Sequence, residues 1–592
     1  MRERASNGLA ALTLGAAIAG CAAWNAPIDP VLDRTVRDRL DQSEGMPVFK
    51  WTKRKPETVE ESLKRMKEET PDGLPPTSPP PKPGGEARQP PERTRQLTIA
   101  DVRGAALHNN LDLEIAKVDP AMAATFVTEE EGRFNELIFA RAKYTRKDTP
   151  PNNMEVVQFQ TPNQNEPIDS QIAKLTEIAQ LTDLLELDAG VTIPLRTGGT
   201  VTLSTPLDEK EMYRGVPSNQ YRSALRFSIS QPLLRAAGVD ANVAPIRIAR
   251  YEQQVVDVKT RLQAIRILAT IDRAYWAVYQ AWGELDIRRQ QYEYASNNLA
   301  MVKRRVAEGL VAAIESKRAE VGVTERMESV IVAETSLKLR QRQLKLLMND
   351  ANLKMDSATI LVPTTRPTLV SFAFDRDQLV KQAQAQRLEL LELELKLAAD
   401  LTKVDYLRNQ TLPLFMLDYS YASLGRNTNS FESAIGQAFS GDFSDWSVGL
   451  RMEYPIGNEQ RLARLERAVN ERLQRLTTRQ LRELTVQREI YDALDTLQQN
   501  WQRIVAARQN VLVAGINYDA ELKQFNEGLR TMTEVLETLT RLGDAQVREI
   551  RAVTDYQIAL IDLSFATGTL LGYSRVDFEG IPRTPSREIR TD

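Results

Sequence analysis

The feature that most constrains this chain is a pair of very long helical segments. Residues 242–308 contain no proline after Pro245, and residues 458–527 contain none. Apolar side chains recur there at three- and four-residue steps, as between Ala264 and Val278, and charged residues fill the other positions. That period predicts coiled-coil packing, and at 1.5 Å per residue roughly 65 to 70 residues form a rod of about 100 Å. We therefore expect a fold built around long helices rather than around a compact α/β core.

Each long segment ends at a glycine-centred reversal. The tripeptide Glu-Gly-Leu occurs at residues 308–310 and again at residues 527–529. A left-handed backbone conformation closes many helix C-termini and is free of strain only for glycine. Two helical hairpins are therefore predicted, with returning helices at residues 312–349 and 531–571.

A second motif also occurs twice. The alternating segment LRFSISQPLL at residues 225–234 has a counterpart, VGLRMEYPIG, at residues 448–457, and each leads through a proline into a long helix. Both motifs keep the same order and nearly the same spacing, which is the signature of an internal repeat. We expect a first repeat at residues 97–350, a linker at 351–373, a second repeat at 374–573 and a C-terminal tail at 574–592.

Each repeat combines a leading helical segment, at residues 97–134 and 374–408, with strand-like segments. Period-two alternation of apolar and polar residues indicates the strands. The predicted strands are residues 137–144, 188–195, 200–204, 221–231, 412–421 and 446–454. Thr197-Gly198-Gly199 is expected to form a hairpin turn, and the polar stretches 148–170 and 425–445 are expected to be loops.

Strands attached to long helices predict a fold that combines a β-sheet with a coiled coil. An antiparallel coiled coil without a pore would explain the helices but not the strands. A few amphipathic strands cannot stand alone in water, and in a bilayer every strand edge must be closed because unpaired backbone groups cost several kcal/mol each. The predicted fold class is α+β: several protomers pool their strands in a transmembrane β-barrel, and their helices continue it as an α-helical coiled-coil barrel.

Composition argues against most other functions. The chain has 77 Lys and Arg residues against 80 Asp and Glu, a net charge of −3, which is unlike a general nucleic-acid binder. Its one cysteine, Cys21, and one histidine, His108, cannot form an intrachain disulfide or a zinc site of the His/Cys type. Triad catalysis would have to use His108, which we expect to be a polar helix-end residue. No enzyme activity, metal or other cofactor is therefore expected.

The N-terminus predicts export and lipidation. Arg2 and Arg4 precede an apolar stretch at residues 9–19, as in a secretory signal peptide, here residues 1–20. The sequence Ile-Ala-Gly-Cys resembles the bacterial lipobox, which implies that Cys21 is diacylated and becomes the mature N-terminus. Ala22, which follows it, is compatible with export to the outer membrane. Residues 21–96 are charged and rich in proline, so they are predicted to be a disordered tether.

The motifs taken together resemble the TolC-type outer-membrane efflux family. The resemblance rests on LTIADVRGAALHNNLDLEIA at residues 97–116, SQPLL at 230–234, YPIGN at 454–458 and the two Glu-Gly-Leu reversals. It implies a homotrimer in which one β-barrel crosses the outer membrane and an α-helical barrel spans the periplasm. It also implies a passive exit duct that works with a periplasmic adaptor and an inner-membrane pump and contacts outer-membrane lipid.

The resemblance also assigns roles to residues near the reversals. Glu534 and Glu537 match the family's pore constriction; in a trimer they would form two stacked rings of carboxylates that favour cations and whose repulsion raises pKa values. Arg530 matches an arginine that helps to hold the closed tip, although Phe525 replaces its usual tyrosine partner. The residues implied to dock the adaptor are Glu308, Gly309, Leu310, Glu527, Gly528 and Leu529. From spacing alone, simple turns and solvated glutamates are the alternatives.

Three further alternatives stay open. The extra hairpin around Gly198 either widens the barrel, to about 18 strands in a trimer, or lies outside it. The duct serves either small-molecule efflux or type I protein secretion. The alternative from a different class is a non-conducting lipoprotein that spans the envelope as a structural element.

Overall fold

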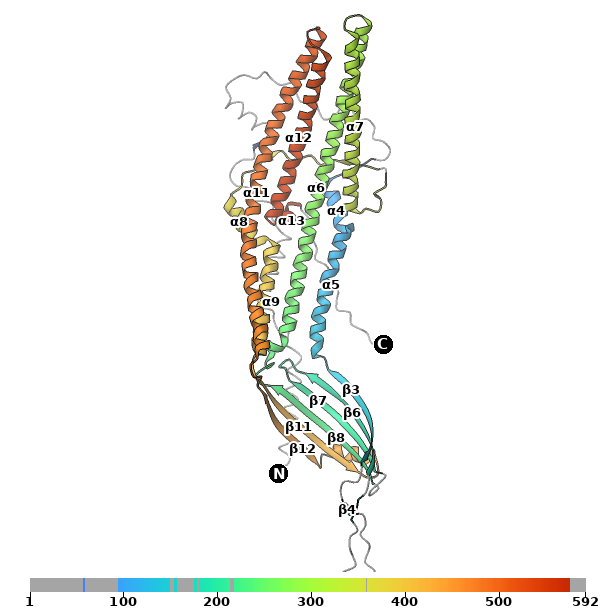
Figure 1. Ribbon diagram of the computed structural model, residues 1–592, viewed down its shortest axis with the longest axis vertical. Helices are drawn as coiled ribbons and strands as arrows, with labels where there is room; N and C mark the ends of the chain where they lie inside the picture. The colour runs from blue at the N-terminus through green and yellow to red at the C-terminus, as the bar shows by residue number, and fades with distance from the viewer. Residues whose placement is uncertain are drawn as a thin grey trace, which may run out of the picture. The chain divides into compact units, whose positions relative to one another are not determined.

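The computed structural model in Figure 1 describes residues 94–149, 180–212, 218–357 and 359–574, together with strand segments at 57–58, 154–156 and 175–177. The predicted signal peptide, Cys21, nearly all of the tether and residues 575–592 of the tail lie outside the described residues. The described chain divides into two compact units. The sheet unit contains residues 123–253 and 395–475, and the helical unit contains residues 94–122, 254–394 and 476–574.

All six predicted strands lie in one antiparallel sheet in the sheet unit (Figure 1). The strand order is β12-β11-β8-β7-β6-β3. The bounds are β3 Leu137–Thr149, β6 Gln180–Pro194, β7 Thr200–Met212, β8 Ser218–Pro232, β11 Leu414–Asn427 and β12 Ser444–Glu453. The hairpin between β6 and β7 is therefore a part of the sheet and not a separate lobe.

The predicted hairpin turn is confirmed, but its two strands are longer than predicted. Gly198 has a φ of 90°, and its backbone N–H donates to the carbonyl of Leu195 at 2.9 Å. β6 begins eight residues before its predicted start and β7 ends eight residues after its predicted end. The additional residues do not alternate cleanly, yet those of β6 pair with both β3 and β7. Pairing on both sides satisfies the N–H and C=O groups of these residues. The local sequence pattern does not reveal such pairing.

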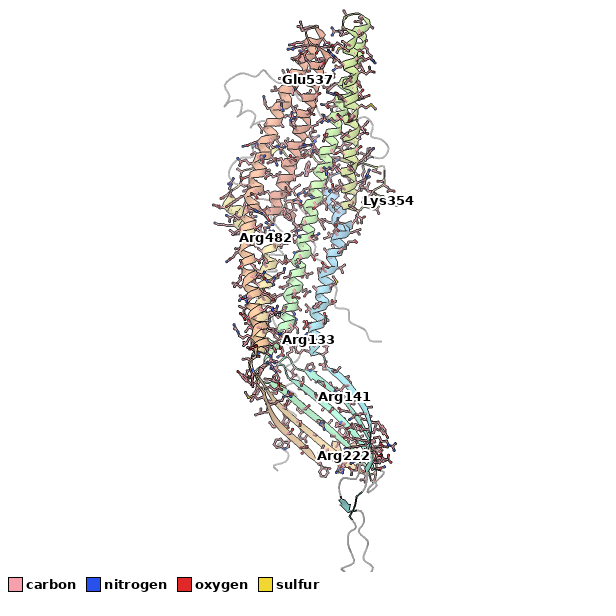
Figure 2. All side chains as sticks on the ribbon, viewed as in Figure 1. Arg133, Arg141, Arg222, Lys354, Arg482 and Glu537 are labelled. Carbon is pink, nitrogen blue, oxygen red and sulfur yellow. The ribbon has the colours of Figure 1, made fainter. Side chains whose placement is uncertain are left out.

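The strand register gives the sheet one apolar face and one polar face, because residues paired across strands share a face. One row crosses all six strands and is wholly apolar: Trp446, Tyr421, Phe227, Leu203, Val191 and Ile138. A row on the opposite face is wholly charged: Lys143, Glu186, Asp208, Arg222 and Arg426. Figure 2 labels Arg222 on this sheet. The two faces therefore suit two different solvents.

A short helix, α10 (Phe431–Ser440), lies on the apolar face, so the prediction of a loop at 425–445 is wrong there. Ser423 and Gly425 lie on that face of β11 and contact the helix. The Ser423 hydroxyl donates to the Ala438 carbonyl at 2.6 Å. A Cβ on Gly425 would lie 1.8 Å from the Ala434 carbonyl oxygen, so only glycine permits this approach.

The helices follow the same order in both halves of the chain. A short pair leads each half, and a long helix with a returning partner follows the strands. In the first half these are α4 Ile99–Asn109, α5 Leu111–Glu131, α6 Val239–Ala307 and α7 Ala313–Met348. In the second they are α8 Arg376–Gln386, α9 Leu388–Gln410, α11 Glu459–Asn526 and α12 Met532–Ala566, followed by α13 Leu570–Ser574. None of the helices in the described part of the chain is long and apolar enough to cross a membrane.

Each leading helical segment is divided into two helices. Between α4 and α5, Asn110 has an extended backbone, and its side chain accepts from the Leu113 backbone N–H at 3.1 Å, which caps α5. Arg387 occupies the corresponding break between α8 and α9, also with an extended backbone. A capping side chain that competes with the helix backbone ends the first helix and starts the second.

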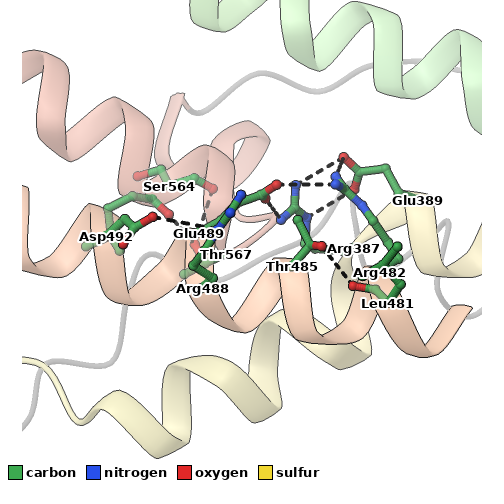
Figure 3. Close-up of polar contacts among 11 residues, drawn as sticks. Arg387, Glu389, Leu481, Arg482, Thr485, Arg488, Glu489, Asp492, Ser564 and Thr567 are labelled. Atoms are coloured by element: carbon green, nitrogen blue, oxygen red, sulfur yellow. Dashed lines mark hydrogen bonds and ion pairs between the residues drawn. The ribbon is translucent and has the colours of Figure 1, made fainter. Parts of the chain in front are cut away.

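A buried ion cluster fixes the α8–α9 break in the helical unit (Figure 3). Arg387 is only 3% exposed and donates through Nε and an Nη atom to both carboxylate oxygens of Glu389, each at 3.1 Å, and also to Glu489. Arg482 of α11 donates to the same two carboxylates, at 3.1 and 3.2 Å. Burial alone would raise the pKa of Glu389, but the Arg387 guanidinium outweighs it and holds that pKa below its ordinary value.

The predicted linker, residues 351–373, contains two short strands. β9 (Ile360–Pro363) pairs in parallel with β2 (Thr94–Leu97), and β10 (Val370–Ser371) pairs with β1 (Glu57–Thr58). The Tyr275 hydroxyl of α6 accepts from the Thr365 N–H at 3.0 Å, and Gln557 of α12 donates to the Thr368 carbonyl at 2.7 Å. The linker is therefore hydrogen-bonded to helices from both repeats.

Candidate functional site

The two helical reversals of the helical unit have the same backbone geometry. In the first, the Leu310 N–H donates to the Arg305 carbonyl at 2.9 Å and Gly309 has a φ of 72°. In the second, the Leu529 N–H donates to the Gln524 carbonyl at 2.9 Å and Gly528 has a φ of 79°. This is the Schellman pattern, in which a left-handed residue lets the chain satisfy the last helical carbonyls. The predicted reversals are thus present at both glycines.

The first hairpin caps the second at the end of α11. Arg305 donates to the Asn526 carbonyl at 2.7 Å and to the Phe525 carbonyl at 3.3 Å. The central carbon of the Arg305 guanidinium lies 5.6 Å from the centroid of the Phe525 ring, which is a cation–π distance. A cation at a helix C-terminus also complements the helix dipole. Arg305 therefore joins the two hairpins through hydrogen bonds, a cation–π contact and a favourable interaction with the helix dipole.

The start of α12 receives the opposite charge from the first hairpin. A carboxylate oxygen of Glu315 accepts from the Met532 backbone N–H at 3.0 Å, and the other oxygen accepts from Arg318 at 2.6 Å. An anion at a helix N-terminus satisfies a free N–H and complements the dipole. One hairpin thus places a cation at one end of the other hairpin's turn and an anion at the other end.

Glu534 is committed to local contacts within one protomer. With Thr531 it forms a capping box, accepting from the Thr531 backbone N–H at 2.8 Å. Its other oxygen accepts from Arg530 at 2.9 Å. The hydrogen bond from the Thr531 backbone, followed by those from Arg530 and the Thr531 hydroxyl, lowers the pKa of Glu534. Within a single chain this shift is opposite in direction to the one expected from a ring of carboxylates.

Glu537 lies one turn further along α12, where Figure 2 labels it. Its side chain is 61% exposed and lies 3.5 Å from Arg541 in an i,i+4 pair. Glu534 and Glu537 therefore differ. Thr531 and Arg530 hold the first at the helix start, whereas the second is a solvated side chain that pairs with Arg541 alone in the described residues. Arg530, predicted as a latch, contacts Glu534 and also Gln524 at 3.0 Å, both within its own hairpin.

Two apolar side chains project from the tips. Leu310 is 64% exposed and Leu529 is 71% exposed. The two turns therefore present apolar surface at matching positions. Phe525, by contrast, is only 3% exposed and packs in a cluster at the tip that includes Met532 and Val535.

Sequence reasoning missed Arg305 and Glu315. The only available signal was positional, because Arg305 lies four residues before Gly309 and Glu315 lies six residues after it. Nothing in the local pattern shows that their partners belong to the other hairpin, more than 200 residues away. The contact between hairpins is tertiary information.

Metal-ligand clusters and clefts are two further kinds of site to consider in the described residues. No group of three His, Cys, Asp or Glu residues that could hold a metal occurs there. A cleft of about 540 Å³ lies between α6, α7 and α12, and its two arginines are paired. Arg326 donates to the Leu536 carbonyl at 3.2 Å, and Arg288 pairs with Asp544 at 3.1 Å. The cleft therefore reflects how charged side chains join the helices.

The sequence of the second repeat matches a known family. Residues 379–569 match the family described as outer membrane efflux protein. The second repeat is therefore similar to outer membrane efflux proteins. This efflux family consists of channels and not of enzymes. The matched residues include α11, the second reversal and α12 up to its end.

Several known proteins are similar to this chain at low sequence identity. The chain is 22% identical over 308 residues to outer membrane protein TolC of Vibrio cholerae serotype O1, over 51% of this chain and 68% of that protein. A membrane protein from Pseudomonas aeruginosa is 16% identical, with a TM-score of 0.57, over 79% of this chain and 90% of that one. The Campylobacter jejuni CmeC outer membrane channel is 15% identical, with a TM-score of 0.55, over 80% and 86%. The likeness to these structures shows the fold of this chain.

Proposed function

We propose that three copies of this chain form an outer-membrane exit duct that passively conducts substrates delivered by a periplasmic adaptor and an inner-membrane pump. The observation that carries the proposal is the six-stranded sheet, whose register puts apolar side chains on one face and charges on the other. An apolar face suits lipid, and a charged face suits a water-filled lumen. The match of residues 379–569 to outer membrane efflux proteins supports the same conclusion.

Closure by several copies follows from the sheet edges. Within the described residues, β3 and β12 each pair on one side only. An open sheet edge does not persist in the hydrocarbon region, because its N–H and C=O groups find no partner in lipid. A homotrimer closes the edges of each copy with those of its neighbours, and the helices then form an α-helical barrel in the periplasm.

The tips are the proposed contact with the other components. Leu310 and Leu529, with the glutamate and glycine that precede each of them, dock the adaptor. Glu534 and Glu537 form the pore constriction, and Arg530 contributes to its closed state through Glu534. At the other end of the chain, diacylated Cys21 adds a lipid anchor in the outer membrane, with the proline-rich segment as a tether.

Single-channel conductance in a planar bilayer tests the duct and its constriction. The wild type is compared with Glu534→Gln/Glu537→Gln, because glutamine removes the charge while keeping the capping box at the start of α12. An exposed pair away from the tips, Glu293→Gln/Glu328→Gln, is the matched control. We expect a small, cation-selective conductance that rises and loses selectivity only in the tip variant.

Three outcomes distinguish the alternatives. Equal conductance and selectivity in all variants would keep the duct and reject the constriction. Absence of conductance from correctly inserted trimers would favour a non-conducting envelope-spanning lipoprotein. Conductance with cargo delivery from a polypeptide exporter, and none from a small-molecule pump, would favour a type I protein-secretion duct.

A further inference from the structure

The hairpin β6–β7 is built as a part of a membrane-spanning sheet. β6 has 15 residues and β7 has 13, and the other four strands have between 10 and 15. A transmembrane strand needs about 9 to 11 residues. Every strand of the sheet, including both strands of the hairpin, is therefore long enough to cross a bilayer.

Both faces of the sheet run through the hairpin without a break. On the apolar face, Leu203 of β7 and Val191 of β6 lie in the row that continues to Phe227 and Ile138. On the polar face, Glu186 and Asp208 continue the charged row between Lys143 and Arg222. A hairpin outside a barrel wall would have no reason to match the flanking strands on both faces.

The hairpin turn is fastened to the junction of β8 and α6, within the sheet unit. The Thr197 carbonyl accepts from the Gly238 N–H at 3.1 Å and from the Gln231 amide at 3.1 Å. A Cβ on Gly198 would lie 2.1 Å from the Ala236 carbonyl oxygen, so the turn is packed closely against the chain that leads into α6. These contacts hold the hairpin in the plane of the sheet at this end.

The sheet can close with further copies of itself. It has six strands, all antiparallel to their neighbours, so its two edge strands, β3 and β12, run in opposite directions. An even number of strands lets identical sheets join edge to edge with the antiparallel alternation intact. On the outer edge, Trp446, Val448 and Leu450 of β12 are 66%, 58% and 65% exposed and continue the apolar face.

We propose that the β6–β7 hairpin is a structural part of the barrel wall, so that three copies close an 18-stranded barrel. The proposal rests on the trimeric duct proposed above. With strands about 4.8 Å apart and tilted about 40°, 18 strands give a backbone radius of about 18 Å, against about 12 Å for the 12 strands that remain without the hairpin. The outer end of the duct therefore accepts bulky polar cargo about 1.5 times wider than a 12-stranded barrel would.

Cysteine labelling in lipid vesicles tests the place of the hairpin. Leu203→Cys and Thr202→Cys put neighbouring thiols on the two faces of β7, and Phe227→Cys and Ser228→Cys do the same on β8. Wild-type protein, which contains Cys21, supplies the background. We expect a charged, membrane-impermeant thiol reagent to modify position 202 at least tenfold faster than position 203, and position 228 at least tenfold faster than position 227.

The β8 pair separates two kinds of failure. If the alternation holds on β8 but the two β7 positions react alike, the hairpin lies outside the wall and this inference is wrong while the duct stands. If the alternation fails on both strands, the sheet does not cross the membrane and the proposed function itself fails.

Polymer exclusion measures the width independently. Residues 150–217 are replaced by a short Gly-Ser turn that joins β3 directly to β8, and neutral polymers of increasing size are added to the side of the bilayer that faces the barrel. We expect the largest radius admitted to fall by about a third relative to the wild type. An unchanged limit in trimers that still insert would overturn the inference. If the shortened chain does not fold, the labelling experiment decides.

Discussion

The guanidinium of Arg305, at the end of α6, lies over the ring of Phe525 and donates to the carbonyl of the residue after it, at the end of α11. The tyrosine that the sequence resemblance leads one to expect at position 525 would have offered a hydroxyl there. The apolar ring is instead used as a buried surface beneath a cation that comes from the other repeat. Arg305 thus contacts the other hairpin, whereas the contacts of Arg530 with Gln524 and Glu534 lie within its own hairpin.

Replacing Arg305 should loosen the second reversal. Arg305→Ala removes a cation–π contact and charged hydrogen bonds to two helix-end carbonyls, together worth about 2 kcal/mol. We expect amide hydrogen exchange at residues 526–532 to become about 10 to 30 times faster. Arg304→Ala, at the neighbouring exposed position, is the control and should leave exchange unchanged. Equal effects of the two substitutions would show that only the charge of this helix end matters.

The conductance should respond to pH only in acid. Hydrogen bonds from Thr531 and Arg530 hold the pKa of Glu534 below its ordinary value of 4.5. A carboxylate with a depressed folded pKa contributes its stabilisation above its unfolded pKa and loses it as pH falls through the folded one. We expect constant conductance from about pH 8 to about pH 5 and a change only below about 4.5, smaller in Glu534→Gln and absent in Glu534→Gln/Glu537→Gln. A Glu534-dependent change between pH 8 and 5 would instead reveal carboxylate repulsion in the trimer.

The tip leucines should affect assembly and not folding. Leu310→Ser/Leu529→Ser changes side chains that are mostly exposed, so the free energy of unfolding should change by less than about 0.5 kcal/mol per site. Adaptor binding, measured by co-purification from cross-linked cells and by surface plasmon resonance, should weaken at least tenfold. Leu339→Ser, at a position on α7 that is 56% exposed, is the matched control. Normal adaptor binding by the double variant would remove the tips from the docking surface.

The ion cluster in Figure 3 should be far more sensitive to substitution than an exposed ion pair of the same unit. Arg387→Met leaves Glu389, which is largely buried, and the half-buried Glu489 with Arg482 as their remaining partner. Because Arg387 is itself buried and engages both carboxylates, we expect a cost of about 3 kcal/mol. Arg488→Met removes an arginine that is 73% exposed and 3.9 Å from Asp492, which costs at most about 1 kcal/mol. Thermal unfolding followed by circular dichroism should separate the two variants clearly. Similar melting temperatures would mean that the cluster relaxes or admits water.

The sequence alone predicts the elements whose signals are local. Absence of proline and a three-to-four-residue period predict α6 and α11, and Gly309 and Gly528 predict their ends. Alternation predicts all six strands at least in part, and Thr197-Gly198-Gly199 predicts the turn between β6 and β7. These features depend on backbone preferences and on side-chain spacing within a few residues, so one stretch of chain contains the necessary information.

Tertiary structure decides everything that depends on a distant partner. The full lengths of β6 and β7 come from pairing on both sides, and α10 forms where Gly425 allows a helix to approach the sheet. The break at Arg387 is stabilised by carboxylates on α9 and α11. Arg305 and Glu315 acquire their roles only because the other hairpin places a helix end beside each of them. Charged residues on helix surfaces are common. Such a residue caps or joins other helices only when the tertiary structure places a helix end beside it.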